Sequence, residues 1–256
     1  MIKIHEKEEF EKMRKAGKLA ATLLYELGKQ TKPGITTLDL DKFAQEFIEK
    51  HNTKSACFGY TGGGKTPFPG YICTCVNHVI CHAFGTNQVL NEGDIISIDV
   101  TLIVDGYHGD TCATFAVGKI SNEAQKLIDA TKHAMEVGIM AAQPGNHFGD
   151  IGYSIEQLMK NKYNNQYSIV EDYCGHGIGT TFHAPPQIEH TGFAGTSEEI
   201  KPGMFFTVEP MINAGTHETR LLKDGWTVIT KDYRLSAQFE HTIGITENGP
   251  EIFTQL

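Results

Sequence analysis

Residues 95–110 of this chain read IISIDVTLIVDGYHGD, and this stretch decides how the first half of the fold is built. Apolar and polar side chains alternate along it, which is the period-2 pattern of a β-strand with one apolar face. An Asp-Gly pair at 105–106 is a two-residue hairpin signal, so the chain is expected to turn back there. In that hairpin Asp110 lies opposite Thr101 and diagonal to Asp99, roughly 7–8 Å away on the same face.

Two carboxylates that converge on one face of a sheet repel each other unless one is protonated or a cation lies between them. A hard divalent metal ion satisfies both carboxylates at once. The simpler alternative is that Asp99 and Asp110 are solvated on the wet face of an antiparallel sheet. The hairpin by itself leaves both interpretations open.

Helix pairs and groups of strands alternate along the rest of the chain, which suggests a duplicated α+β half. Helices are expected over 10–27, after a cap at Thr36 or Thr37, and near 122–141 and 148–162, and strands within 71–117, 167–175, 204–213, 225–230 and 236–246. The Gly- and Pro-rich stretch 57–70 is expected to be an exposed loop. No compositional break resembles a linker, so one catalytic domain is expected over 1–256.

Composition excludes several classes of protein. The chain of 256 residues carries a formal net charge of −9, which argues against a protein that coats nucleic acids. Hydrophobic residues make up 40% of the chain, which argues against intrinsic disorder. Neither a secretory signal nor an apolar stretch of about 18 residues is visible. A reduced enzyme of the cytoplasm is therefore expected, without direct nucleic-acid specificity and without a membrane partner.

The stretch Gly59–Thr66 reads GYTGGGKT, a literal match to the phosphate-binding loop of nucleotide-binding proteins. Such a loop needs a helix that begins at its Lys-Thr pair, so that backbone N–H groups and the helix dipole hold the phosphate. Pro67 and Pro69 follow at once, and proline disfavours the helical conformation of the residue before it. A Gly-rich loop at the rim of a pocket is therefore the preferred interpretation.

The second half of the chain supplies further candidate site residues. His176 lies between glycines in CGHGIG, which let the backbone approach a ligand closely, and His183 follows it. Glu209 and Glu240 interrupt apolar strand patterns, in FTVEP and AQFEHTI. Each alone is most simply a capped or ion-paired carboxylate, because buried carboxylates are rare otherwise. Together with the two aspartates of the hairpin, these residues favour a metal site.

The same residues lie in sequence blocks that resemble type I methionine aminopeptidases of the bacterial kind. The blocks cover essentially the whole chain and read CTCVNHVICHAF, GDIISIDVTLIVDGYHGDT, YCGHGIGTTFHAPPQI, KPGMFFTVEPMI, KDGWTVITKD and LSAQFEHTI. The resemblance implies the α+β pita-bread (creatinase/aminopeptidase) fold, a curved antiparallel sheet flanked by two helix pairs with pseudo-two-fold symmetry. It also implies a dinuclear-metal aminopeptidase that removes the initiator methionine when the second residue is small.

The resemblance also implies which residues hold the metal ions. The expected ligands are Asp99, Asp110, His176, Glu209 and Glu240. Asp110 and Glu240 would bridge two divalent ions, Asp99 would bind one of them, and His176 and Glu209 would bind the other. Oxygen-rich ligands with one imidazole suit Mn, Fe, Co or Zn.

Catalytic and substrate-binding roles follow from the resemblance in the same way. Glu209 would take a proton from the attacking water, and His82 and His183 would hydrogen-bond the scissile amide, although an ordinary strand histidine is the alternative for His82. The expected substrate-binding residues are Cys57, Tyr60, Cys73, His82, Phe182, His183, Trp226 and Gln238. Sulfur-containing and aromatic side chains suit a methionine side chain, while an ordinary core role remains the alternative for the aromatics.

The loop between Tyr60 and Cys73 is longer than in the usual bacterial relatives. The family has a second aromatic pocket residue in this loop, for which Phe68 and Tyr71 are the candidates. The shape of the pocket at this rim therefore cannot be read from the pattern.

Two rival functions stay open at this point. Prolidases and X-prolyl aminopeptidases share the fold, although they usually carry a large extra N-terminal domain. A metal-free binding protein on the same scaffold would be expected to lack some ligands, whereas all five are present. The expected partners are the N-termini of nascent polypeptides, with contact to the ribosome left open, and a monomer is expected.

Overall fold

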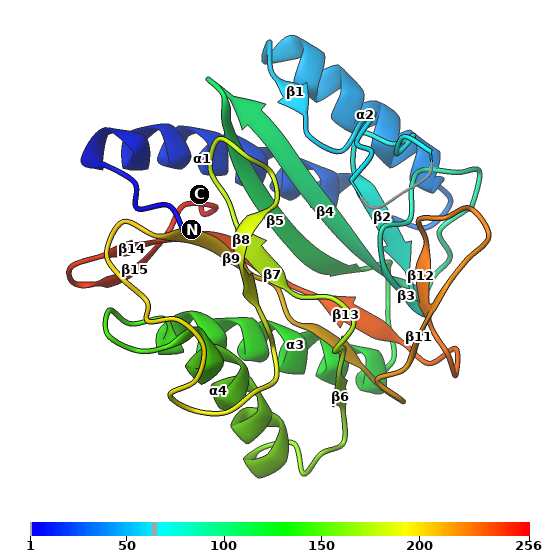
Figure 1. Cartoon of the computed structure of the whole chain (residues 1–256). Helices are drawn as coiled ribbons and strands as arrows, with labels where there is room; N and C mark the ends of the chain where they lie inside the picture. Colours follow the sequence, from blue (N-terminus) through cyan, green and yellow to red (C-terminus); the bar gives the residue numbers. More distant parts are fainter. Residues whose placement is uncertain (1, 63–65) are drawn as a thin grey trace.

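In the computed structural model of the chain, which describes residues 2–62 and 66–256, four long helices flank a curved antiparallel sheet (Figure 1). The helices are α1 (Lys7–Gln30), α2 (Thr37–Lys50), α3 (Asn122–Ala141) and α4 (Phe148–Asn161). All four expected helices are confirmed. Thr36 caps α2, because its side chain accepts a hydrogen bond from the backbone N–H of Asp39 and the Asp39 carboxylate accepts one from the N–H of Thr36.

The large sheet has the strand order β1-β4-β5-β14-β9-β7-β8, with β2 paired to β4 and β15 paired to β14. Its strands are β1 (Lys54–Ser55), β2 (Cys73–Val76), β4 (Ile95–Val104), β5 (Tyr107–Ala116), β7 (Gly175–Gly177), β8 (Ala184–Ile188), β9 (Phe205–Val208), β14 (Glu240–Thr246) and β15 (Gly249–Ile252). Two smaller sheets are β13 (Ser236–Gln238), β10 (Met211–Asn213) and β6 (Ser168–Ile169), and β11 (Thr219–Leu221), β12 (Val228–Thr230) and β3 (Val79–Cys81).

The β4–β5 hairpin has the register expected from the sequence. Asp105 and Gly106 both have positive φ, at 51° and 81°, as a two-residue hairpin turn requires. Thr101 lies opposite Asp110, and Asp99 lies opposite Cys112. Asp110 is only 3% exposed, so the alternative of two solvated aspartates on a wet sheet face is wrong.

Each helix pair covers its own part of the sheet with an apolar core. Helices α1 and α2 pack against the apolar face of β4, where Ile96, Ile98 and Leu102 are completely buried. Helices α3 and α4 pack on the other half, around β9 and β14 (Figure 1). Helix α1 lies so close to β5 that a Cβ atom on Gly109 would come within 2.4 Å of the backbone of Ala16. Gly109 therefore allows the strand that carries Asp110 to lie directly against the helix.

Three local expectations need correction. The strand expected over 167–175 is wrong, because only Ser168–Ile169 and Gly175 lie in strands. Strand β8 was not expected, because it contains two prolines, which usually mark an edge or a turn. The exposed loop expected over 57–70 is wrong in part, because Phe68 is only 4% exposed and anchors the loop in the interior.

Residues 63–65 of the phosphate-loop motif lie outside the described residues. The described residues that follow it, 66–72, contain no helix. A phosphate-binding loop needs a helix after its Lys-Thr pair, and these described residues do not form one.

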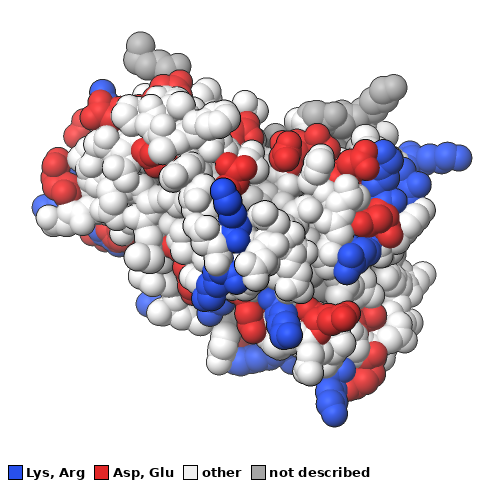
Figure 2. Space-filling model, turned by 90° about the horizontal axis from the view of Figure 1, so that it is seen from below, with Lys and Arg blue, Asp and Glu red and all other residues white. Residues whose placement is uncertain are grey.

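Surface charge is mixed on the face that Figure 2 shows, where Lys and Arg side chains are interspersed with Asp and Glu. Among the described residues, no helix combines the length and apolar character that a membrane span requires.

Candidate active site

Five neighbouring strands of the large sheet each carry or adjoin one of the five predicted metal-ligating residues. In spatial order these are Asp99 on β4, Asp110 on β5, Glu240 on β14, Glu209 directly after β9, and His176 on β7. Residues far apart in sequence meet because Glu240 pairs with Cys112, the residue opposite Asp99. The β9–β14 register pairs Val208 with His241, and one further step brings Glu209 opposite Glu240.

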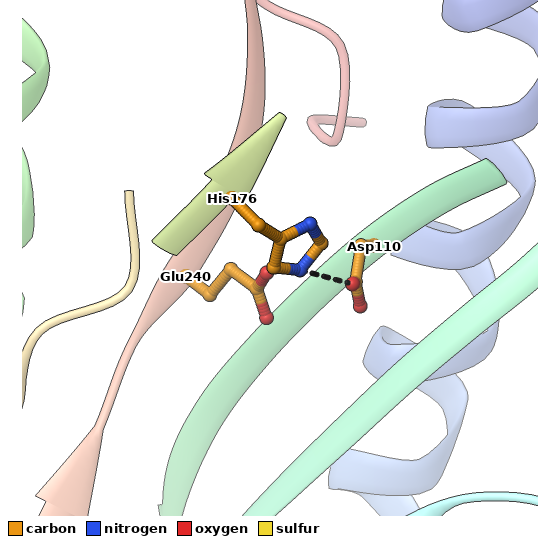
Figure 3. Close-up of side chains that lie close together, drawn as sticks. All are labelled: Asp110, His176 and Glu240. Atoms are coloured by element: carbon orange, nitrogen blue, oxygen red, sulfur yellow. Dashed lines mark ion pairs between the residues drawn. The ribbon is translucent and has the colours of Figure 1, made fainter. Parts of the chain in front are cut away.

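Three of these side chains point toward one another (Figure 3). Ligand atoms of Asp110, His176 and Glu240 all lie within 4.8 Å of one another. Nε2 of His176 is 3.6 Å from Oδ2 of Asp110 and 3.7 Å from Oε1 of Glu209. The imidazole thus faces two carboxylates, as a ligand does when a cation lies among them.

The electrostatics of this cluster disfavour four simultaneous negative charges. Burial, followed by the charge of Asp110, raises the pKa of both Asp99 and Glu240 well above the ordinary carboxyl range. Burial raises the pKa of Glu209 to about 7, although the charge of His176 and a hydrogen bond from Thr207 oppose it. Burial works to lower the pKa of His176, but contact with Asp110 and the charge of Glu209 outweigh it and raise that pKa.

The donor set fits divalent metal ions. Oδ1 of Asp99 and Oε1 of Glu240 are buried and have no hydrogen-bond partner among the described residues. Buried carboxylate oxygens without partners are costly, and a cation removes that cost. Within residues 2–62 and 66–256, the only basic side chain that forms ion pairs with these acids is His176. The cluster therefore matches the oxygen-rich, one-imidazole ligand sets of divalent metal sites.

Two further histidines line the same cavity. His82 has a φ of 59°, a conformation that is strained for a bulky residue and is typical of functional positions. Burial lowers the pKa of His82 to about 4, and burial together with the charge of His176 lowers the pKa of His183 to about 4. Nδ1 of His183 is hydrogen-bonded to the hydroxyl of Tyr60 at 2.8 Å, so Nε2 is the ring atom that remains for another partner.

An apolar pocket adjoins the acidic cluster in one cavity of about 330 Å³. Its walls include every predicted substrate-binding residue, namely Cys57, Tyr60, Cys73, His82, Phe182, His183, Trp226 and Gln238. Cys73 lies opposite Asp99 in the sheet, so the pocket opens beside the Asp99 end of the acidic cluster.

The long loop contributes Phe68 to this pocket. Its ring lies edge-on to that of Trp226 at 5.3 Å, and the Trp226 indole N–H donates to the carbonyl of Thr66 at 3.1 Å. Tyr71, the other candidate, instead stacks on Phe58. Of the two candidates, Phe68 therefore lines the pocket and Tyr71 does not.

Some residues of the site were missed by sequence reasoning. Tyr173 and Gln187 also line the cavity, and the hydroxyl of Thr207, in β9 two residues before Glu209, donates a hydrogen bond to the Glu209 carboxylate. Tyr173 carried a weak signal, because it directly precedes the CGHGIG block. Thr207 carried none, because a threonine in an apolar run is ordinary strand composition.

Comparisons with known proteins agree with this site. The model of metallopeptidase family M24 matches residues 11–247. Methionine aminopeptidase A of Synechocystis is 50% identical over 254 residues, which are 99% of this chain and 97% of that protein. The crystal structure of methionine aminopeptidase from Rickettsia prowazekii superposes with a TM-score of 0.95 at 49% identity, and all of both chains is covered.

More distant solved structures share only the fold. The prolidase from Pyrococcus furiosus is 20% identical with a TM-score of 0.73. The match covers 99% of this chain but 65% of the prolidase, so the prolidase has a further part without a counterpart here. The likeness confirms the expected pita-bread architecture.

Proposed function

The chain belongs to metallopeptidase family M24, and from this premise we propose that it is a methionine aminopeptidase whose catalysis is divided among the residues of the cavity. One observation carries the proposal: a cluster of four carboxylates and an imidazole shares a single cavity with a pocket of sulfur-containing and aromatic side chains. The cluster supplies hydrolytic chemistry, and the pocket selects a methionine side chain.

We propose that the cluster would hold two divalent ions: Asp110 and Glu240 would serve both, Asp99 would bind one, and His176 and Glu209 would bind the other. When bound, such ions activate a water molecule and polarise the scissile carbonyl. Mn, Fe, Co and Zn all suit these ligands. The unpartnered oxygens of Asp99 and Glu240 support this assignment.

The chain's own groups orient the substrate and move its protons. Glu209 takes the proton of the attacking water and returns it to the leaving amine, a role that suits a carboxylate in the same cavity as the substrate pocket. His82 and His183 hydrogen-bond the scissile amide. Their lowered pKa values keep both rings neutral, so His82 has one N–H donor and one acceptor, while His183, whose Nδ1 is hydrogen-bonded to Tyr60, has only Nε2 for the substrate.

The pocket explains why only the first residue is removed. A methionine side chain among Cys57, Cys73 and Trp226 brings its own free amine toward Asp99, because Cys73 and Asp99 are opposite in the sheet. The proposal extends to a monomer that acts in the cytoplasm on the N-termini of nascent polypeptides.

Peptide hydrolysis tests the proposed substrate. We expect release of methionine from Met-Ala-Ser, much slower release from Met-Ile-Ser, and no cleavage of Ala-Pro-Ala. Preferred cleavage of Ala-Pro-Ala would instead identify a prolyl peptidase on the same fold.

The protein is also expected to keep its own first methionine, because the family prefers a small second residue and here Ile2 follows Met1. The intact mass of the purified protein measures whether Met1 is retained.

Substitution of Phe68 by alanine tests the pocket. Because the ring packs on Trp226, its loss opens the pocket and is expected to lower kcat/KM for Met-Ala-Ser by about 10–200-fold, mainly through KM. Phe58→Ala is the matched control, because Phe58 lies in the same loop but is 54% exposed. Equal effects of the two variants on KM would show that the loop, not the Phe68 ring, matters.

A further inference from the structure

Thr207 lies in β9, and its side chain is completely buried beside two of the proposed ligands, His176 and Glu209. Its hydroxyl oxygen accepts a hydrogen bond from the backbone N–H of His176 at 3.0 Å. The same hydroxyl donates to Oε1 of Glu209 at 2.7 Å. One side chain thus contacts both His176 and Glu209.

The direction of each hydrogen bond follows from the chemistry of the groups. A backbone N–H only donates, so the hydroxyl of Thr207 must accept from His176. The single hydroxyl proton then has two acceptors in reach, Oε1 of Glu209 at 2.7 Å and the carbonyl of His176 at 3.5 Å. The shorter contact is the stronger one, because hydrogen bonds weaken toward the longer distance.

This hydroxyl makes the shortest of the hydrogen bonds that hold Glu209. Gln238 donates to Oε2 at 3.4 Å, and the backbone N–H of Glu209 donates to Nε2 of His190 at 3.1 Å. The carboxylate oxygen that Thr207 holds is also the one that lies 3.7 Å from the His176 ring. Loss of the hydroxyl would free the carboxylate to rotate away from that ring.

We propose that Thr207 is a positioning residue, whose hydroxyl fixes Glu209 and His176 relative to each other before a metal ion binds. The inference rests on the proposed function, since it takes these two residues as ligands of one ion. Partners behind the ligands of a metal site orient them, and their loss weakens metal binding without removing a ligand.

Three variants separate positioning from packing. Thr207→Val removes the hydroxyl at nearly constant volume and keeps a β-branched residue in the strand. Thr207→Ser keeps the hydroxyl and removes a methyl group. Thr131→Val is the matched control, because Thr131 is equally buried but donates only to the carbonyl of Leu127 in α3. If Thr207→Val does not fold, Thr207→Ala takes its place in the same comparison.

Two readouts are needed, namely Mn²⁺ binding to the chelator-treated full chain by calorimetry and steady-state hydrolysis of Met-Ala-Ser. Thr207→Val is expected to weaken the binding of one Mn²⁺ and to lower kcat by roughly 10–100-fold, with KM nearly unchanged because the pocket is intact. Thr207→Ser is expected to retain most of the wild-type Mn²⁺ affinity and kcat. Thr131→Val is expected to change neither quantity.

Each other outcome contradicts the proposal. Wild-type Mn²⁺ affinity in Thr207→Val, or a serine variant as weak as the valine variant, would show that the hydroxyl does not position the ligands. Equal losses in Thr131→Val would assign the effect to packing. A wild-type protein that binds Mn²⁺ but releases no methionine would refute the proposed function instead, while the Mn²⁺ comparison still decides the role of Thr207.

Discussion

Asp110→Asn is expected to lower kcat/KM for methionine release by more than the roughly 100-fold that loss of an outer-shell partner costs, because it removes a ligand proposed to be shared by both ions. Asp110 is buried, faces His176 at 3.6 Å and lies within 4.8 Å of Glu240. Asparagine keeps the shape of the side chain but lacks the negative charge that holds a divalent cation. Steady-state hydrolysis of Met-Ala-Ser with added Mn²⁺ measures the loss.

The melting temperature provides a second test of the Asp110→Asn substitution. In the metal-free protein, asparagine at position 110 relieves repulsion with Asp99 and Glu240 but also removes the ion pair with His176, so each protein's melting temperature is compared with and without Mn²⁺. A ligand at 100 times its Kd stabilises the folded state by about 2.7 kcal/mol, or roughly 5–10 °C for a chain of this size. Asp110→Asn is expected to lose most of that metal-dependent increase.

The matched control for Asp110→Asn is the same change at Asp105, in the turn of the same hairpin. Asp105 is exposed and pairs with Lys15, and asparagine before Gly106 suits the turn equally well. Asp105→Asn should therefore leave both activity and metal-dependent stabilisation unchanged. A fully active Asp110→Asn variant would show that Asp110 is not a required metal ligand.

Glu209→Gln is expected to lower kcat by at least about 10²–10⁴-fold with little change in KM, because it removes a general base and the charge of a proposed metal ligand but leaves the methionine pocket intact. The amide oxygen of glutamine can still accept the hydrogen bond from Thr207, so the local structure should persist. Melting temperature and circular dichroism verify that persistence.

The control for Glu209→Gln is Glu189→Gln, at an exposed glutamate that directly follows β8. It has the same loss of charge but lies outside the acidic cluster, and its kcat should equal that of the wild type. A change in KM alone for Glu209→Gln would mean that Glu209 binds substrate and does not move a proton.

Local signals predicted the hairpin but not the assembled site. The turn at Asp105 and Gly106 determines the β4–β5 register, so the placement of Asp110 opposite Thr101 followed from neighbours in sequence. Glu240 reaches the same face through pairing with β5, whose residues precede it by more than a hundred positions. The apolar pattern around Glu240 marked it as a candidate, but no local pattern encodes this pairing, and its expected role as a metal ligand came from the resemblance to a known family.

The pocket loop shows a different limit. Its Gly and Pro content predicts an exposed loop, and composition carries no sign that Phe68 turns inward against Trp226. Thr207 was missed because threonine is common in strands whether or not its hydroxyl has a function. Both residues act through contacts that exist only after the chain has folded.

The central claim is that metal ions in the acidic cluster drive removal of the first methionine. Its most direct measurement is methionine release from Met-Ala-Ser by the metal-free protein, titrated with Mn²⁺, Co²⁺, Fe²⁺ and Zn²⁺ beside Glu209→Gln. The account predicts no release without metal, release restored by at least one of these ions, and little restoration in the variant. Undiminished release without metal, or none with any of the four ions from the folded wild-type protein, would contradict it.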